Sequence, residues 1–290
     1  MNQARPWLQS YPAGVAAEID LEQFRTVAEV FATSVKRFAD RPAYHSFGKT
    51  ITYRQADQLV EQFAAYLLGE LQLKKGDRVA LMMPNCLQYP VATFGILRAG
   101  LTVVNVNPLY TPRELEHQLK DSGAKAIFIV ENFAHTLEQC IAATPVQHIV
   151  LCAMGDPLGF VKGAIVNYVV RSVKKLVPAF RLPGAVRFKD ALSRGARGRF
   201  TAPEIGPDDV ALLQYTGGTT GISKGAVLLH RNVIANVLQS EAWNDPAMQK
   251  VPKGEQTTVI CALPLYHIFA FTVNMMLGMR IGAKTVLIPN

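Results

Sequence analysis

The stretch "GDRVALMMPNCLQYPVATFGILRAGLTVVNVN", residues 76–107, contains a complete strand–helix–strand unit. Residues 76–83 form a short apolar run that is typical of a buried strand, and residues 101–107 form a second one. Between them, residues 88–100 have a helical pattern that ends at Gly100. This alternation favours a mainly parallel sheet with helices packed against it.

The same alternation continues on both sides of this unit. Residues 50–71 begin extended and then predict an amphipathic helix, whose apolar face comprises Ala56, Leu59, Val60, Phe63 and Leu67. Residues 111–123 predict a helix with marked ends, because a capping box at its start and Gly123 at its end delimit it. Further strands are predicted at 124–130, 148–153, 208–218, 257–264 and 284–289, and further helices at 231–243 and 267–282.

The predicted fold class is therefore α/β, with mainly parallel sheets and flanking helices. Four regions are expected along the chain. They are an N-terminal segment packing on the core (1–50), a first α/β subdomain (51–156), a basic amphipathic insertion and loop (157–206), and a second α/β subdomain (207–290). The sequence stops at Asn290 directly after an apparent core strand, so the second subdomain is expected to be truncated there.

The charge of the chain is concentrated in one block. The 290 residues carry a net charge of +8, yet residues 161–200 hold ten Lys or Arg against a single acid, Asp190. A nucleic-acid-binding surface would more often be distributed or rich in aromatic residues, so no nucleic-acid partner is predicted. This local basic block needs an explanation of its own.

Targeting and redox signals point to the cytoplasm. Residues 1–14 are polar and interrupted by prolines, which does not fit a secretion signal, and no apolar run is long enough to span a membrane. The four cysteines, Cys86, Cys140, Cys152 and Cys261, form no CxxC pair and no metal-ligand spacing with histidine. They are expected to be reduced, mostly buried thiols.

The strand at 208–218 leads into "YTGGTTGISKGAVLLH", residues 215–230, and then into the predicted helix at 231–243. Neither the Walker A pattern nor the G-x-G-x-x-G fingerprint fits this loop. Glycines nevertheless let backbone N–H groups converge on phosphate oxygens, while hydroxyls add donors and a lysine adds charge. The candidate phosphate cradle comprises Thr216, Gly217, Gly218, Thr219, Thr220, Gly221, Ser223 and Lys224. The alternative interpretation is a flexible surface loop.

This loop resembles the signature loop of the adenylate-forming superfamily, and "LPLYHIFAF" at 263–271 resembles the next superfamily motif. The stretches "YPAGVAAEID" (11–20) and "NPLYTPRELEHQLKDSGAKA" (107–126) resemble bacterial long-chain fatty-acid–CoA ligases in particular. The resemblance implies the N-terminal portion of that enzyme fold. It also implies ATP, a fatty acid and coenzyme A as substrates, with Mg²⁺ accompanying the ATP.

Residue roles follow from the resemblance alone. It places Lys224 near the β- and γ-phosphates, Thr216 near Mg²⁺, and His267 as a catalytic group near the α-phosphate. Ile268 would contact the nucleotide, and Phe271 would be a gate to the acyl tunnel. Two bland alternatives remain open, a helix-start histidine satisfied by backbone for His267 and a core position for Phe271. The rival functions are an adenylating ligase for another carboxylic acid and a non-catalytic nucleotide- or lipid-binding fragment.

The basic block begins with "FVKGAIVNYVVRSVKKLVPAF", residues 160–180. A helix here would place the apolar residues Val161, Ala164, Ile165, Tyr168, Val169, Val173 and Leu176 on one face. The cations Lys162, Arg171, Lys174 and Lys175 would lie largely off it. Such a helix can lie peripherally on an anionic membrane, at the inner face of the cell membrane for a cytoplasmic protein. Equally, it can be an ordinary helix packed by its apolar face. Nothing in the sequence indicates an oligomeric state.

Overall fold

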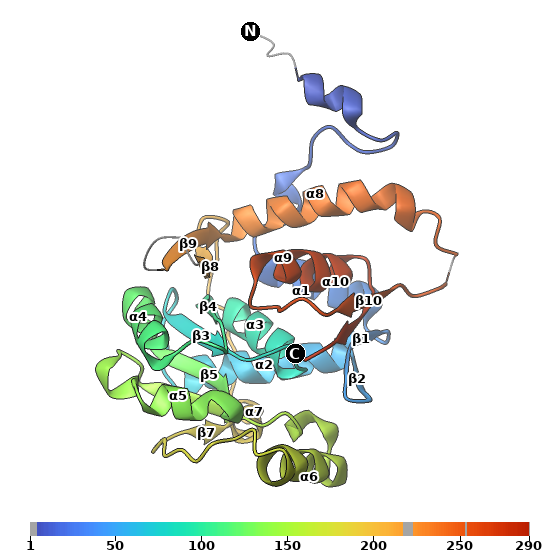
Figure 1. The fold of residues 1–290 in the computed structure, drawn as a ribbon. Helices are drawn as coiled ribbons and strands as arrows, with labels where there is room; N and C mark the ends of the chain where they lie inside the picture. Colours follow the sequence, from blue (N-terminus) through green and yellow to red (C-terminus); the bar gives the residue numbers. More distant parts are fainter. Residues whose placement is uncertain (1–4, 217–222, 253, 290) are drawn as a thin grey trace.

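A computed structural model describes residues 5–216, 223–252 and 254–289 (Figure 1). In these residues the larger sheet has seven strands in the order β7-β6-β5-β3-β4-β8-β9. Its strands are β3 (Arg78–Met82), β4 (Thr102–Val106), β5 (Ala126–Val130), β6 (His148–Cys152), β7 (Val186–Arg187), β8 (Val210–Thr216) and β9 (Lys224–Leu229). All neighbouring strands are parallel except β8 and β9. The predicted fold class is confirmed.

A second sheet has the order β10-β11-β1-β2 in the described residues. Its strands are β1 (Pro42–Ser46), β2 (Lys49–Thr52), β10 (Thr258–Cys261) and β11 (Lys284–Leu287). Both sheets therefore combine strands from distant parts of the chain. Strands β8 and β9 extend the sheet that begins in residues 51–156, and β1 pairs in parallel with β11. The division into four regions stays a prediction.

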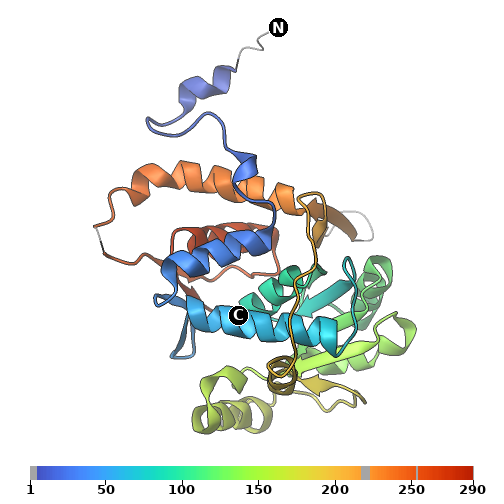
Figure 2. The same ribbon diagram turned by 180° about the vertical axis from the view of Figure 1, so that it is seen from behind.

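The longer helices flank the sheets. They are α1 (Val27–Phe38), α2 (Tyr53–Gly69), α3 (Gln88–Arg98), α4 (Pro112–Ser122), α7 (Phe188–Gly195) and α8 (His230–Met248). On one side of the larger sheet, α2, α3 and α7 enclose an aromatic core in which the rings of Phe63, Phe128 and Phe188 are in contact. Residues 5–20 reach beyond α8 in both views (Figures 1 and 2). Tyr11 in this segment contacts Trp243 of α8 edge-on.

The predicted helix at 111–123 is confirmed with its caps. Glu114 N donates to Thr111 Oγ1 at 3.4 Å, and Thr111 N donates in return to Glu114 Oε2 at 2.8 Å. Gly123 adopts a left-handed φ of 62°, which ends the helix. This agreement is expected because capping depends on local residues that the sequence displays directly.

Three segments differ from the elements that were predicted from the sequence. Residues 224–229 form strand β9, because their backbone pairs with the edge of β8 before helix α8 begins. The helix at 267–282 is divided into α9 (Ile268–Ala270), a π-helical segment (Phe271–Leu277) and α10 (Gly278–Arg280). The helix starting at residue 160 comprises α6 (Phe160–Tyr168) and a π-helical turn, Val169–Val173. It does not reach Phe180, because Lys175 has a φ of 52°.

Other short elements complete the description. They are α5 (Ala134–Glu138) and the 3₁₀ turns Pro6–Ser10, Leu21–Gln23, Glu131–Phe133, Ile141–Ala143 and Asp156–Leu158. All four cysteines are free and buried, as predicted. Among the described residues, no helix is long and apolar enough to cross a bilayer.

Candidate active site

The hairpin β8–β9 brings the ends of the predicted phosphate cradle together. Thr216 and Lys224 are direct partners in the antiparallel register, and both side chains are exposed. Ser223 Oγ donates to the carbonyl of Thr216 at 3.1 Å. The remaining cradle residues, Gly217, Gly218, Thr219, Thr220 and Gly221, lie outside the described residues. The hairpin thus presents one hydroxyl and one cation side by side.

Contacts with helix α4 hold this hairpin from one side. Tyr215 donates its hydroxyl to Asp121 Oδ2 at 2.5 Å, and His117 Nε2 lies 3.1 Å from the carbonyl oxygen of Ser223. Burial first, and then Asp121, raise the pKa of Tyr215, so its hydroxyl stays a proton donor. A helix with two strong caps therefore carries two of the groups that fix the hairpin.

A buried polar network connects the hairpin to the segment 261–267. Asn105 Nδ2 donates to Gln214 Oε1 at 3.1 Å, and Gln214 Nε2 donates to the carbonyl of Tyr266 at 3.0 Å. The Tyr89 hydroxyl lies 2.7 Å from Asn105 Oδ1 and 2.8 Å from the carbonyl oxygen of Leu265, and these two acceptors share its single proton. Buried polar groups that are fully paired specify a single geometry, whereas unpaired ones are costly. This network therefore fixes the backbone that leads to His267.

Asn85, at the end of β3, holds the same segment from a second direction. Its Nδ2 donates to the carbonyl of Leu263 at 2.9 Å, and its Oδ1 accepts from the backbone N–H of Leu265 at 2.8 Å. Asn85, Pro108 and Tyr266 line a cavity of about 270 Å³ at the carboxyl ends of β3 and β4. Ligands of open α/β sheets bind at such strand ends, beside the point where the strand order reverses.

His267 stands at the entry to α9 with an exposed side chain. Its Nδ1 lies 3.5 Å from the backbone nitrogen of Phe269, which is a long and weak cap. Ile268, the next residue, lines a groove between α8 and residues 268–273 with a volume of about 510 Å³. The groove residues are Leu228, Asn232, Val233, Asn236, Ser240, Ile268, Phe269, Thr272 and Val273.

Phe271 lies elsewhere. Its side chain is 0% exposed within the main core, and it does not line this groove. The exposed aromatic residue in the groove is Phe269, two residues earlier. A gating role for Phe271 stays a prediction, and its burial favours the alternative that it is a core residue.

The structure adds residues that sequence patterns did not single out. Asn85, Asn105 and Gln214 are buried polar residues within or directly after apolar strands. A polar residue among buried strand positions is a usable signal, because burying an amide is unfavourable unless it is hydrogen-bonded. Phe269 and Asn236 gave no comparable signal, since only the packing of α8 against residues 268–273 brings them together.

Comparisons with known proteins agree with this geometry. Residues 31–290 match the AMP-binding enzyme family. A long-chain-fatty-acid–CoA ligase of Escherichia coli O6:H1 is 54% identical over 98% of this chain, and one of Bacillus subtilis is 33% identical over 100% of this chain. In each case the chain spans about 50% of the relative's length.

Two solved structures have the same fold. An anthranilate CoA ligase in complex with anthranoyl-AMP aligns with a TM-score of 0.74 at 20% identity, over 94% of this chain and 47% of its own. A long-chain-fatty-acid–CoA ligase from Archaeoglobus fulgidus aligns with a TM-score of 0.70 at 21% identity, over 96% of this chain and 49% of its own. With the hairpin, the strand-end network and the matched range together, the chain belongs to the AMP-binding enzyme family.

Proposed function

We propose that the complete protein is an ATP-dependent long-chain fatty acid–CoA ligase, of which this chain supplies the phosphate-binding hairpin. The observation that carries the proposal is the pairing of exposed Thr216 and Lys224 across the hairpin end, beside a segment that a buried network holds in place. The 54% identity with a long-chain-fatty-acid–CoA ligase supports the choice of acid.

The reaction has two displacements. A carboxylate oxygen of the fatty acid attacks the α-phosphorus of ATP, and pyrophosphate leaves to give an acyl-adenylate. The thiolate of coenzyme A then attacks the acyl carbon, and AMP leaves with the electron pair of the broken C–O bond. Catalysis of such transfers consists mainly of positioning and charge neutralisation. Lys224 would neutralise the departing pyrophosphate, and His267 would contact the α-phosphate and the acyl carboxylate.

Mg²⁺ fits this site only in part. Magnesium is bound through one or two protein oxygens together with substrate phosphates and waters. The Thr216 hydroxyl is a suitable oxygen, but no cluster of three acidic, histidine or cysteine residues occurs in the described ranges. The Thr216 hydroxyl would therefore hold a Mg²⁺ ion that is bound mainly by ATP, and the ion would supply positive charge that stabilises the departing pyrophosphate.

The groove between α8 and residues 268–273 would hold part of the acyl chain. Val233, Phe269 and Val273 give it an apolar lining, and Ile268 directly follows His267. A carboxylate near His267 would thus continue into an apolar groove. Phe269, rather than buried Phe271, is the aromatic residue that an acyl chain would meet there.

The test is acid-dependent exchange of pyrophosphate into ATP by the complete protein. Palmitate should support exchange, and benzoate should not. Exchange with benzoate alone would identify a ligase for another acid. A folded protein that exchanges with no acid in a panel of aryl, medium-chain and long-chain acids would be a non-catalytic binding protein.

Peripheral contact with an anionic membrane, through the helix α6, forms the second part of the proposal. The inner side of α6 is small and polar: Gly163 packs against Gly155, and Asn167 Oδ1 accepts from Gly155 N at 2.8 Å. Its apolar residues face outward instead, with Phe160 93% and Tyr168 65% exposed. We define the α6 surface as the exposed residues Phe160, Val161, Ile165, Tyr168 and Val173 together with Lys174 and Lys175.

An apolar surface edged by lysines is suited to the interface of an anionic bilayer. Co-sedimentation with vesicles of phosphatidylglycerol and phosphatidylcholine tests it. Phe160→Ser with Ile165→Ser should abolish sedimentation, while Leu109→Ser, a change at an exposed apolar residue outside the α6 surface, should not. Equal sedimentation of all three proteins would contradict a role for α6.

A further inference from the structure

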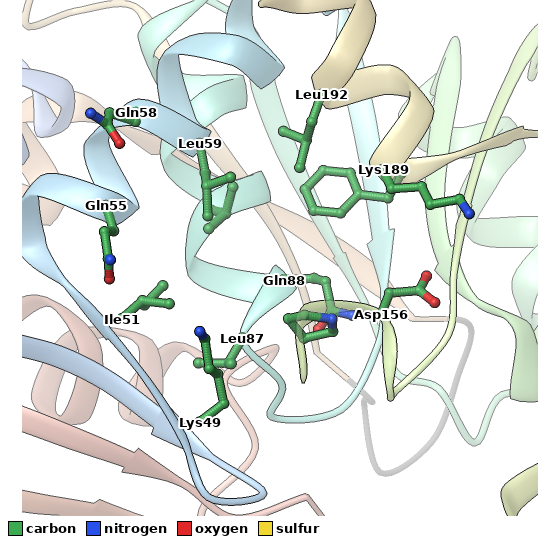
Figure 3. A pocket seen from close by; sticks show the side chains of 13 residues that line it. Lys49, Ile51, Gln55, Gln58, Leu59, Leu87, Gln88, Asp156, Lys189 and Leu192 are labelled. Carbon is green, nitrogen blue, oxygen red and sulfur yellow. The ribbon is translucent and has the colours of Figure 1, made fainter. Parts of the chain in front are cut away.

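A second apolar cavity lies apart from the candidate active site. It has a volume of about 370 Å³ and shares no lining residue with the groove beside α8 or the cavity at Asn85. Strand β2, helices α2 and α7, the start of α3 and the turn at Asp156–Pro157 enclose it (Figure 3). We call it the α2–α7 cavity.

Its walls are mainly aliphatic and aromatic. The apolar lining residues are Ile51, Leu59, Leu87, Val91, Pro157, Phe188 and Leu192. In Figure 3, the labelled leucine side chains of α2 and α7 point toward each other across the cavity. An apolar cavity of this size lies at the small end of the range for ligand sites, which suits one hydrocarbon chain better than a two-chain lipid.

The polar groups of the cavity are unequally available. Lys49 of β2 extends into the cavity between Ile51 and Leu87, whereas Lys189 extends away along its rim (Figure 3). In the described ranges, Lys49 Nζ has no hydrogen-bond or ion-pair partner. The carboxylate of Asp156 is already engaged, because it accepts from Ala153 N at 2.8 Å and from Asn167 Nδ2 at 3.2 Å. Of the two lysines that line the cavity, Lys49 is therefore the one whose cation extends into it.

We propose that the α2–α7 cavity binds a single-chain fatty acid anion, with its carboxylate at Lys49 and its chain against Leu59 and Leu192. Charge complementarity selects the head group, because an ammonium-headed amphiphile would be repelled by Lys49. Burial of apolar surface supplies most of the affinity. This site is additional to the acyl groove beside α8, and it does not depend on ligase activity.

The cavity also adjoins helix α6. Asp156 lines the cavity, and its carboxylate holds Asn167 of α6. Lys162 of α6 donates to the carbonyl of Phe47, in the turn that precedes Lys49. A chain bound here would thus lie beside the helix whose apolar residues are exposed.

Photo-crosslinking with dodecanoate that carries a diazirine at its methyl end tests the proposal. The label should appear on peptides from residues 49–59 and 188–192. Leu192→Trp, which fills the cavity, should remove this label. Lys49→Gln should reduce the label about fivefold, because it removes one exposed ion pair between the lysine and the carboxylate. Lys189→Gln is the matched control and should leave it unchanged. Uncharged dodecanol should compete equally well in the Lys49→Gln protein and the unchanged protein.

Label confined to residues 228–273, or label on α2 and α7 that persists in the Leu192→Trp protein, would overturn the proposal. Thermal unfolding of each variant guards against misfolding, and Lys49→Gln changes only an exposed side chain. The two proposals fail separately: labelling of the α2–α7 cavity without acid-dependent exchange would refute ligase activity and keep this site.

Discussion

The hairpin β8–β9 and the helix α6 lie at opposite ends of the molecule and present their exposed groups in different ways (Figures 1 and 2). The hairpin is fixed by strand pairing and by hydrogen bonds from α4, and its partner segment by buried amides at the strand ends. Helix α6 and the turn after it are held by a close glycine contact and by the polar contacts of Lys162, Asn167 and Arg171. The hairpin is thus continuous with the larger sheet, whereas α6 is attached to it by a few side chains.

A buried ion pair beneath α6 attaches the end of this helix to the rest of the protein. Glu131 is buried, and its carboxylate accepts from Arg171 at 2.7 and 2.8 Å and from Arg187 at 2.9 Å. Both arginine side chains remain partly exposed. The sequence analysis grouped Arg171 with the lysines of the basic block, but in the structure Arg171 is paired with Glu131. Changes at the hairpin should therefore affect chemistry, and changes at α6 should affect attachment and surface binding.

The largest effect is expected for Lys224→Ala in the complete protein. Removing one group that stabilises transition-state charge lowers rates about 100-fold or more. Lys224 is exposed at the hairpin end, so the melting temperature should not change. Pyrophosphate exchange into ATP is the measurement, and Lys250→Ala at an exposed position after α8 is the control. Exchange at the original rate in a folded Lys224→Ala protein would remove this residue from the reaction.

The next largest effect is expected for the stability of the protein at low pH, and it arises at His230 next to the hairpin. His230 begins α8 directly after β9, and its Nδ1 accepts from Val27 N at 3.1 Å. Burial lowers the pKa of His230 to about 4, and the nearby Asp209 only partly opposes this. Because the unfolded chain binds this proton near pH 6.5, acid favours unfolding.

The free energy of unfolding should fall by about 2 kcal/mol between pH 7 and pH 5 through this residue alone. Urea unfolding at several pH values measures it. His230→Asn keeps an acceptor near Val27 N and cannot titrate, so its stability should be flatter over this interval. An identical pH dependence in both proteins would show that other groups dominate.

A comparable but local effect is expected for Gly163→Ala. A Cβ at Gly163 would lie 2.5 Å from the carbonyl oxygen of Gly155, so α6 must shift. Overpacking of this kind costs about 1–3 kcal/mol when the structure cannot relax. Proteolysis at 155–175 should accelerate while pyrophosphate exchange stays normal, with Val161→Ala at an exposed position of the same helix as the control. Loss of exchange would show that α6 and the active site are coupled.

The same two regions differ in how far the sequence predicted them. Strands β3 to β6 and the caps of α4 were predictable, because buried strands are apolar runs and capping residues act locally. Strand β9 was missed, because pairing with β8 depends on tertiary contact rather than on the pattern of residues 224–229. The pairing of Asn105 with Gln214 likewise depends on the strand order, which periodicity does not give.

For helix α6, the sequence left open which face is packed. A helix usually packs by its apolar face, and here Gly163 and Asn167 form the packed side while Ile165 and Tyr168 are exposed. Periodicity identifies which residues share a face, but it does not say which face is buried. Leu176 also falls outside the helical face, because the left-handed Lys175 ends the helix before it.

The smallest effect on vesicle binding is expected for single charges in and next to the α6 surface. It distinguishes cations that the sequence pattern did not tell apart. Lys174→Gln should weaken binding to phosphatidylglycerol-containing vesicles about fivefold, since a basic residue near an anionic surface contributes about 1 kcal/mol. Lys162 already donates to the carbonyl of Phe47, and Arg171 is paired with Glu131, so their charges are partly committed within the protein. Arg171→Gln should therefore lower the stability of α6 more than Lys174→Gln does, measured as proteolysis at 155–175. The Lys174 effect should also vanish at high salt, because screening removes attraction between exposed charges. Vesicle binding that responds equally to Lys174→Gln and Arg171→Gln, in proteins of equal stability, would mean that α6 is not held by the contacts described.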